Sequence, residues 1–309
     1  MCGGGLLGGI MRGQLRILLR HAAYPALMAT LVAVAIAALR LHWDLGRVSQ
    51  LFLVGTIAYM ALLEWLIPYE PEWAPSAREW GWYGVYFVLT MIGGALSQVP
   101  VAAVVRWAAP PHPALPLWAE LPLALLLGSL ANYLVHRWCH TDPRLWRLHG
   151  VHHVPDKVNV GNNGVNHLLD IVLTQGAVQC SLALAGFSTE AVFVMGLFVV
   201  SQGYFVHANI DVRIGVLNHV LAGPEQHRLH HSVDLSEAGH YGSDLSIWDH
   251  AFGSFTWRPG RRPVAVGLRN PADFPRTDEV VASHLQAWRR PTRADDSPTG
   301  SAGVSRPTQ

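Results

Sequence analysis

Long apolar stretches are the feature that most limits what this chain can fold into. Two of them read AAYPALMATLVAVAIAAL and LFLVGTIAYMALLEWLIP, and each approaches the roughly 20 residues that a helix needs to cross a bilayer. The last stretch is interrupted near Gly186, which divides it into a helical hairpin with arms of about 19 residues. The stretches occupy residues 22–39, 51–68, 83–105, 115–135 and 168–206. We therefore predict an all-α integral membrane protein, built as a bundle of transmembrane helices.

The composition favours a membrane protein over a soluble one. Of the 309 residues, 50% are hydrophobic and only 14% are charged, whereas soluble domains carry roughly 25% charged residues. The alternative, a large soluble protein with buried helices, would have to bury all of the apolar stretches within about 210 residues. The formal net charge is +1, so the chain lacks the basic field with which nucleic-acid-binding proteins attract phosphates, and we expect no nucleic-acid partner.

Arginines near the ends of the apolar stretches indicate the orientation. Arg12, Arg16 and Arg20 precede the first stretch, and such residues stay on the cytoplasmic side. Counting crossings from there places the residues after Val135 in the cytoplasm, and the hairpin returns the chain to the same side before His207. Arginines also flank the first outer loop, so the assignment of sides rests on a small bias. Val135 and His207 lie on the same side of the membrane whichever side that is, provided that the chain crosses an even number of times between them.

These features divide the chain into four regions. We expect a cytoplasmic N-terminal segment over residues 1–21, transmembrane helices over 22–135, and a polar C-terminal segment over 259–309. The region between them, 136–258, contains the hairpin 168–206 and most of the histidines, and we expect it to be catalytic. Residues 291–309 (PTRADDSPTGSAGVSRPTQ) have the composition of a disordered tail.

Histidines are concentrated in three short motifs that follow the apolar stretches. The motifs are HRWCH at 136–140, HGVHH at 149–153 and HRLHH at 227–231, and His167 and His207 bracket the hairpin. On a helix, residues four apart share a face, so histidines at this spacing converge on one ion. The candidate ligands are His136, His140, His149, His152, His153, His167, His207, His227, His230 and His231.

The number of imidazoles indicates two metal ions. One zinc ion takes four ligands, so eight to ten histidines are too many for one site and suit two. Imidazole binds iron, zinc, copper and nickel, so the ligand type does not select the metal. A site at the membrane edge can meet a lipid chain, and cleaving a hydrocarbon C–H bond requires oxygen activation by a redox metal. We therefore favour two iron ions with O2 as co-substrate, although zinc can occupy such ligands in purified material.

A membrane zinc-dependent hydrolase or a metal transporter is the alternative function. Transport predicts ionisable residues at mid-membrane, but the acidic residues near the predicted span interiors, Glu64 and Glu120, lie toward their ends. Hydrolysis predicts a carboxylate base within a histidine motif, as in HExxH, and the three motifs contain none. Both observations favour the oxygenase.

At these motifs the chain resembles the fatty acid hydroxylase and sterol desaturase superfamily of integral membrane non-haem di-iron enzymes. The resemblance covers about residues 125–258 and includes HANI at 207–210 and YGSDLSIWDHAFGSF at 241–255. It implies transmembrane helices under a cytoplasmic cap in which histidines hold two irons that activate O2. It also implies a hydroxylase or desaturase of a lipid, sterol, carotenoid or other long apolar substrate. The electrons would come from a separate donor, either a ferredoxin or a cytochrome b5-like protein with its reductase.

The resemblance also suggests roles for residues that are not ligands. By position, Asp249 in the Trp-Asp pair would orient a ligand imidazole through its other ring nitrogen, and Asn163 and Asn166 would serve similarly. The chain departs from the family's pattern at His240, where many members have asparagine directly before the Tyr-Gly pair. His240 would be an extra ligand or a harmless exchange, and we favour the exchange.

Overall fold

The structure, a computed structural model, describes residues 3–288, with side chains from residue 13 onward. Within that range the chain is helical, and it contains isolated β-bridges but no β-strand. The predicted all-α fold class is thereby confirmed. The tail predicted to be disordered, residues 291–309, lies outside the described residues.

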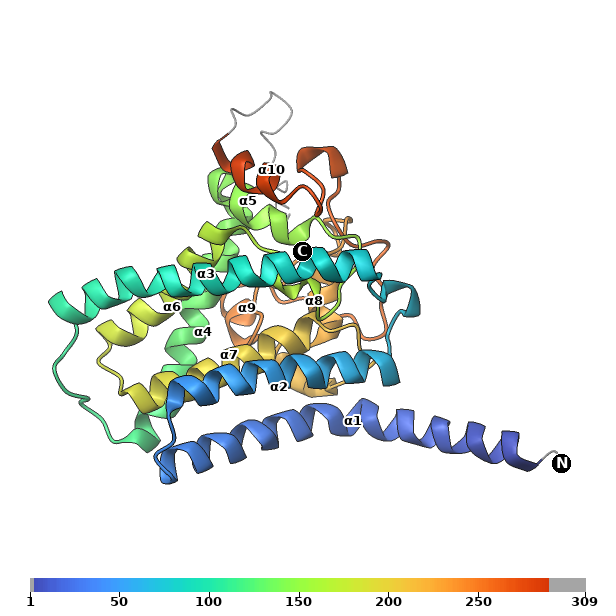
Figure 1. The fold of residues 1–309 in the computed structure, drawn as a ribbon, viewed down its shortest axis with the longest axis horizontal. Coiled ribbons are helices and arrows are strands. Elements are labelled where there is room, and N and C mark those ends of the chain that lie inside the picture. Colours follow the sequence, from blue (N-terminus) through green and yellow to red (C-terminus); the bar gives the residue numbers. More distant parts are fainter. Residues whose placement is uncertain (1–2, 289–309) are drawn as a thin grey trace, which may run out of the picture.

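Long helices form the bundle and short helices form a cap over part of it (Figure 1). The bundle consists of α1 (Gly3–Arg40), α2 (Leu45–Leu66), α3 (Ala77–Trp107), α4 (Leu117–Thr141), α6 (Leu168–Leu184) and α7 (Thr189–His207). The cap contains α5 (Pro143–His149), α8 (Pro224–His230), α9 (Ile247–Phe252) and α10 (Val280–Leu285). Short 3-10 turns lie at Pro71–Trp73, Gly150–His153, Asn162–Gly164, Gly215–His219, Pro271–Asp273 and Gln286–Trp288.

The bundle is long and apolar enough to cross a membrane several times. Among the described residues, five helices meet the length and hydropathy of a span, namely α1 from Gly13 onward, α2, α3, α4 and α7. The sixth bundle helix, α6, is a shorter apolar helix of 17 residues that packs beside α3 and α4. The chain is therefore a multi-pass integral membrane protein.

Local sequence signals set where the long helices begin. Asp44 caps α2 by accepting a hydrogen bond from the main-chain N–H of Arg47 at 2.7 Å. Ser76 and Glu79 form a reciprocal capping box at the start of α3, which satisfies main-chain donors that the first helical turn leaves unpaired. Asp142 ends α4 and caps α5, whose first residue is Pro143.

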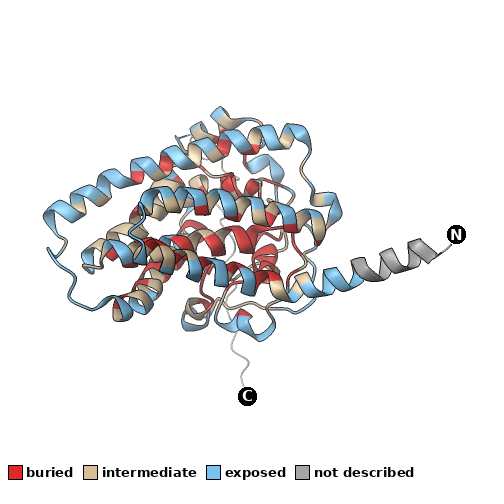
Figure 2. Ribbon diagram, turned by 60° about the horizontal axis from the view of Figure 1, so that its bottom comes forward, coloured by how far each residue is buried: buried red, intermediate tan, exposed pale blue. Residues whose placement is uncertain are grey.

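Helix α7 is the centre of the bundle, and α3 is at its edge. In their most apolar windows, 56% of α7 is buried but only 11% of α3, and Figure 2 shows the buried residues gathered around the centre. Phe205 of α7 packs against Tyr24 of α1 with a ring-centroid distance of 4.4 Å and the rings tilted by 34°. A helix exposed like α3 must face lipid, whereas α7 is enclosed by protein.

Close packing of α3 on α6 depends on a glycine. A Cβ atom added at Gly93 would lie 3.0 Å from side-chain atoms of Ile171 and from the main-chain oxygen of Leu168. The start of α6 is therefore held directly against α3. This contact places the first turn of α6, which contains Asp170, beside the cap.

The chain after α9 crosses back over the cap, and we call residues 264–288 the C-terminal strap. Its main chain exchanges hydrogen bonds with the cap, including Val233 N–H to Ala265 O and Gly267 N–H to His231 O, both at 3.0 Å. Phe274 of the strap is buried and packs on Gly150. The strap thus covers the segment that carries the second histidine motif.

Candidate metal centre

The fold brings the ends of several helices together at the cap. His136 and His140 lie in the last turns of α4, His149 ends α5, and His207 ends α7. His152 and His153 lie in the 3-10 turn Gly150–His153, and α8 ends in His227, His230 and the adjacent His231. Each of the three motifs thus lies at or beside the end of a helix.

Nine of the ten predicted ligands form two groups. In each group, one ligand atom per residue lies within 4.8 Å of the corresponding atoms of the other members. The first group is His136, His140, His149, His153 and His230, and the second is His152, His207, His227 and His231. The groups are in contact, because the rings of His153 and His231 stack with centroids 4.2 Å apart.

Hydrogen bonds at Nδ1 orient five of these rings. The Nδ1–H of His149 donates to the carboxylate of Asp170 at 3.0 Å. In the other four, Nδ1–H donates to a main-chain carbonyl oxygen: His136 to Tyr241, His152 to Val165, His207 to Asn159 and His230 to Gly239, at 2.6–3.2 Å. This arrangement fixes the tautomer in which Nε2 carries the lone pair, as metal-ligating histidines require.

In most of these rings the opposite nitrogen is buried and has no hydrogen-bond partner among the described residues. The Nε2 atoms of His136, His149, His153, His207 and His230 make no hydrogen bond within the described chain. The Nε2 atoms of His227 and His231 lie 3.1 Å apart. Buried polar atoms normally find a partner, so a set of lone pairs aimed at each other indicates a site for cations.

Burial also favours the neutral form of the imidazoles that belong to the cap. It lowers the pKa of His152, His153, His227, His230 and His231 well below the ordinary histidine value, and the neighbouring histidines lower the pKa of each further. A neutral imidazole is the form that binds a metal. The ligand set is therefore ready for a cation at neutral pH.

Asp170 contacts the first histidine group, although the histidine motifs gave no sign of it. It lies in the first turn of α6, is 3% exposed, and holds His149 with one carboxylate oxygen. Its other oxygen lies 3.8 Å from the Sγ of Cys139. The sequence does contain a signal, since Asp170 is an ionisable residue inside the apolar stretch 168–206, and such residues are rare without a role.

Asp249 acts on a loop and not directly on an imidazole. Its carboxylate accepts hydrogen bonds from the main-chain N–H groups of Tyr241 and Gly242, at 2.7 and 2.9 Å, and from Ser254 Oγ at 2.7 Å. The carbonyl oxygen of Tyr241 in turn orients His136. Asp249 therefore supports a ligand through one intervening peptide.

The structure places His167 and His240 outside both groups. His167 caps α6 by accepting from Leu169 N–H at 3.1 Å, and its Nε2 contacts the carbonyl oxygen of His284 at 3.1 Å. His240 has a φ of 60°, and its Nδ1 lies 3.6 Å from Asp249. Asparagine and histidine tolerate this left-handed conformation better than most residues, which accounts for an exchange between them.

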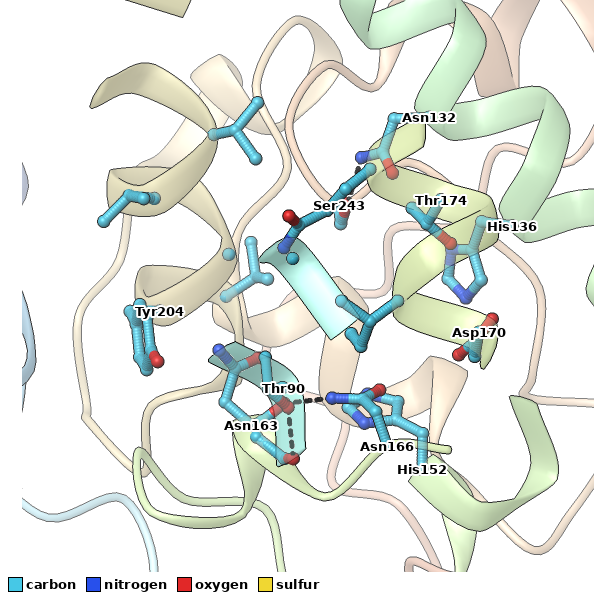
Figure 3. A pocket seen from close by; sticks show the side chains of 18 of the residues that line it. Thr90, Asn132, His136, His152, Asn163, Asn166, Asp170, Thr174, Tyr204 and Ser243 are labelled. Carbon is cyan, nitrogen blue, oxygen red and sulfur yellow. Dashed lines mark hydrogen bonds between the residues drawn. The ribbon is translucent and has the colours of Figure 1, made fainter. Parts of the chain in front are cut away.

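Asn163 and Asn166 line the cavity beside the histidines. The side-chain N–H of Asn166 donates to the main-chain oxygen of Asn163 at 2.9 Å, and Figure 3 shows both near Thr90 and His152. The cavity has a volume of about 370 Å³ and is lined by members of both histidine groups: His136, His149, His152 and His227. A molecule in it would contact both groups at once.

Comparisons with known proteins agree with this geometry. Residues 121–254 match the sequence profile of the fatty acid hydroxylase family. The chain is 29% identical to the ornithine lipid hydroxylase OlsE of Rhizobium tropici, over 79% of this chain and 78% of that protein. It is 28% identical to the alkylglycerol monooxygenase of Homo sapiens over 52% of this chain, which spans only 36% of that protein.

The matched region, 121–254, contains all nine histidines of the two groups. A comparison with solved structures finds no match. The profile match and the lipid-modifying relatives bear out the resemblance of residues 121–254 to the fatty acid hydroxylase and sterol desaturase superfamily.

Proposed function

We propose that the protein hydroxylates a membrane lipid, using O2 and two iron ions held by the two histidine groups. The observation that carries the proposal is the pair of groups, nine clustered imidazoles of which four, His136, His149, His152 and His227, line a single cavity. The names of the relatives support the reaction class, since they are an ornithine lipid hydroxylase and alkylglycerol monooxygenases.

The residues present fit two iron ions. The first group offers five imidazoles and the second offers four, and imidazole is a suitable ligand for iron. Bound at these groups, a pair of irons would supply the oxygen activation needed to cleave a C–H bond. A hydrolytic zinc site would need a carboxylate base beside the ligands. Asp170 lines the cavity, but one of its oxygens accepts the Nδ1–H of His149 and the other faces the Sγ of Cys139 at 3.8 Å, so the structure gives it the role of orienting a ligand.

The protein's own groups supply placement and a controlled environment. The Nδ1 partners hold each oriented imidazole in a fixed tautomer and direction. The cavity wall opposite the histidines comes from α3, α6 and α7, which are apolar helices of the bundle. A lipid entering from the membrane would therefore reach the histidines without crossing bulk water.

Electrons would come from a separate donor, a ferredoxin or a cytochrome b5-like protein with its reductase. Conversion of a C–H bond to an alcohol with O2 consumes two electrons and two protons and releases one water. We place the cap in the cytoplasm, where such donors are found, because Arg12, Arg16 and Arg20 precede the first span.

The test is incorporation of labelled oxygen into a lipid. Iron-loaded protein in nanodiscs, containing ornithine lipid and an alkylglycerol, is supplied with NADPH, ferredoxin and its reductase under 18O2. We expect an alcohol product that carries one 18O atom, and no product from the His152→Ala variant. Absence of labelled alcohol when both irons are reduced by the donor would contradict hydroxylation. An alkene product would instead indicate a desaturase.

A further inference from the structure

A second cavity continues the one beside the histidines into the bundle. We call the first the histidine-side cavity and the second the membrane-side cavity. The membrane-side cavity has a volume of about 390 Å³ and lies among α2, α4, α6 and α7. Five residues line both cavities: Asn132, Thr174, Gln175, Val199 and Val200. The shared lining makes the two cavities one path that leads from the bundle to the metal centre.

The path changes from apolar to polar toward the histidines. Beyond the shared residues, the membrane-side cavity is lined by side chains such as Val178, Leu182, Val192, Phe193 and Met195. The histidine-side cavity is ringed by polar side chains, which Figure 3 labels: Thr90, Asn163, Asn166, Asp170, Tyr204 and Ser243. From Thr174 to Leu182 the apolar part extends along α6 for about 12 Å. It therefore has room for an alkyl chain.

At the junction, polar side chains have hydrogen-bonding capacity that the protein does not use. Within the described chain, no hydrogen bond is made by the amide of Gln175 or the hydroxyl of Thr174. The amide nitrogen of Asn132 donates to Ser243 and Asp244, at 2.9 and 3.3 Å, which leaves its carbonyl oxygen for another donor. We call Asn132, Thr174 and Gln175 the polar collar.

A glycine on α3 makes room for one member of the collar. A Cβ atom at Gly94 would lie 2.9 Å from Oε1 of Gln175, so any larger residue there would push the amide away. Gly94 also lines the histidine-side cavity. An amide without a protein partner is thus accommodated inside an apolar helix bundle, where polar groups usually mark a substrate path.

We propose that the polar collar binds the head group of an amphiphilic lipid, one that carries a neutral amide or hydroxyl next to its alkyl chain. This rests on the proposed function and adds the way the substrate lies. The alkyl chain occupies the membrane-side cavity, and the head group lies against the collar and the histidines. A plain hydrocarbon in the same place would leave the collar unpaired, which a binding site penalises.

The position of the oxidised carbon follows from this placement. The collar residues line both cavities, so they lie between the apolar part of the membrane-side cavity and the four histidines of the histidine-side cavity. The C–H bond that is hydroxylated therefore lies in the head group or beside it, and not in the middle of the chain.

The first experiment measures binding to metal-free protein in amphipol. The probes are radiolabelled N-dodecanoylethanolamine, which has an amide and a hydroxyl, and dodecane, which has neither. Gln175→Met keeps the volume but removes the amide, so we expect affinity for the amide probe to fall on the order of tenfold. Dodecane binding should not change. Thr174→Val is a second variant of the same kind, in case Gln175→Met does not fold.

Gln98→Met is the matched control, because Gln98 is exposed on α3 and lines neither cavity. It should bind both probes like the parent protein. Equal affinity of the parent protein for both probes, or an unchanged preference in both collar variants, would overturn the proposal.

The second experiment locates the new hydroxyl group after turnover of the amide probe by iron-loaded protein. A product oxidised at the head group or the adjacent carbon is expected, and a mid-chain alcohol overturns the collar proposal while leaving lipid hydroxylation intact. If no lipid is hydroxylated at all, the proposed function fails. The binding preference then still decides whether the collar recognises a head group.

Discussion

At the residue scale, the hydrogen bond between Asp170 and His149 illustrates how the site is held. The carboxylate is buried at the start of α6 and accepts the Nδ1–H of an imidazole whose Nε2 has no other partner. A carboxylate in this place raises the basicity of a ligand and fixes its ring. Asp170 should therefore act on metal binding more than on folding.

Asp170→Asn tests that role. The amide keeps the shape but loses the charge, so we expect metal affinity at the first histidine group to fall by on the order of 10–100-fold. Chelator competition followed by elemental analysis measures the loss, and the second group should keep its metal. Asp278→Asn on the strap is the control. Unchanged retention of both metals in Asp170→Asn would contradict the assignment.

His240 supplies a second prediction at this scale. Its φ of 60° is tolerated by asparagine but strained for β-branched residues. We expect His240→Asn to keep the metal content and the thermal midpoint, and His240→Val to cost about 1–2 kcal/mol in unfolding free energy. Loss of metal from His240→Asn would instead make His240 a ligand.

The residue types of the site could be predicted from sequence, but their partners could not. The spacing of the motifs identifies eight of the nine histidines that the structure brings together, and the ninth, His207, follows the hairpin. The carbonyl oxygens of Tyr241, Val165 and Asn159, which orient three of them, carry no side-chain signal at all. His167 has the residue type and location of a ligand, and only the fold shows that it caps α6.

At the element scale, the packing of the C-terminal strap on the cap could not be predicted from the sequence of the strap. Its Pro- and Arg-rich residues have no helical periodicity, yet Phe274 is buried against the cap. The contact is long-range and depends on a glycine, because a Cβ atom at Gly150 would lie 2.2 Å from the ring of Phe274. The apolar stretches, in contrast, predicted the spans because length and hydropathy are local properties.

Gly150→Ala tests whether the strap is anchored at this contact. Overpacking should cost about 1–3 kcal/mol, seen as a lower thermal midpoint in detergent. In a Phe274→Ala background, which removes the clash, adding Gly150→Ala should cost almost nothing further. Additive losses in the double variant would mean that Phe274 does not pack on Gly150.

At the scale of the whole molecule, the bundle presents its histidines at one end, where α4 and α7 finish and α6 begins. The N-terminal end of α1 extends from the same end of the bundle (Figure 1). The cap and the N-terminus should therefore share a side of the membrane, which we propose is the cytoplasm.

Reporter fusions test this topology. Green fluorescent protein fused after Trp288, and separately before Met1, should fluoresce in both cases, while periplasmic alkaline phosphatase at the same points should be inactive. Phosphatase activity at both points would reverse the orientation. Activity at only one would contradict the number of crossings.

Metal content decides whether the protein holds two iron ions, because each histidine group should bind one. Protein purified after growth in iron-rich medium should contain about two iron ions per chain, with a Mössbauer spectrum of two coupled, nitrogen- or oxygen-ligated sites. Paired substitutions in one group, His149→Ala with His153→Ala or His207→Ala with His231→Ala, should each leave about one. A parent protein that binds zinc without iron, or a single ion per chain, would contradict the account.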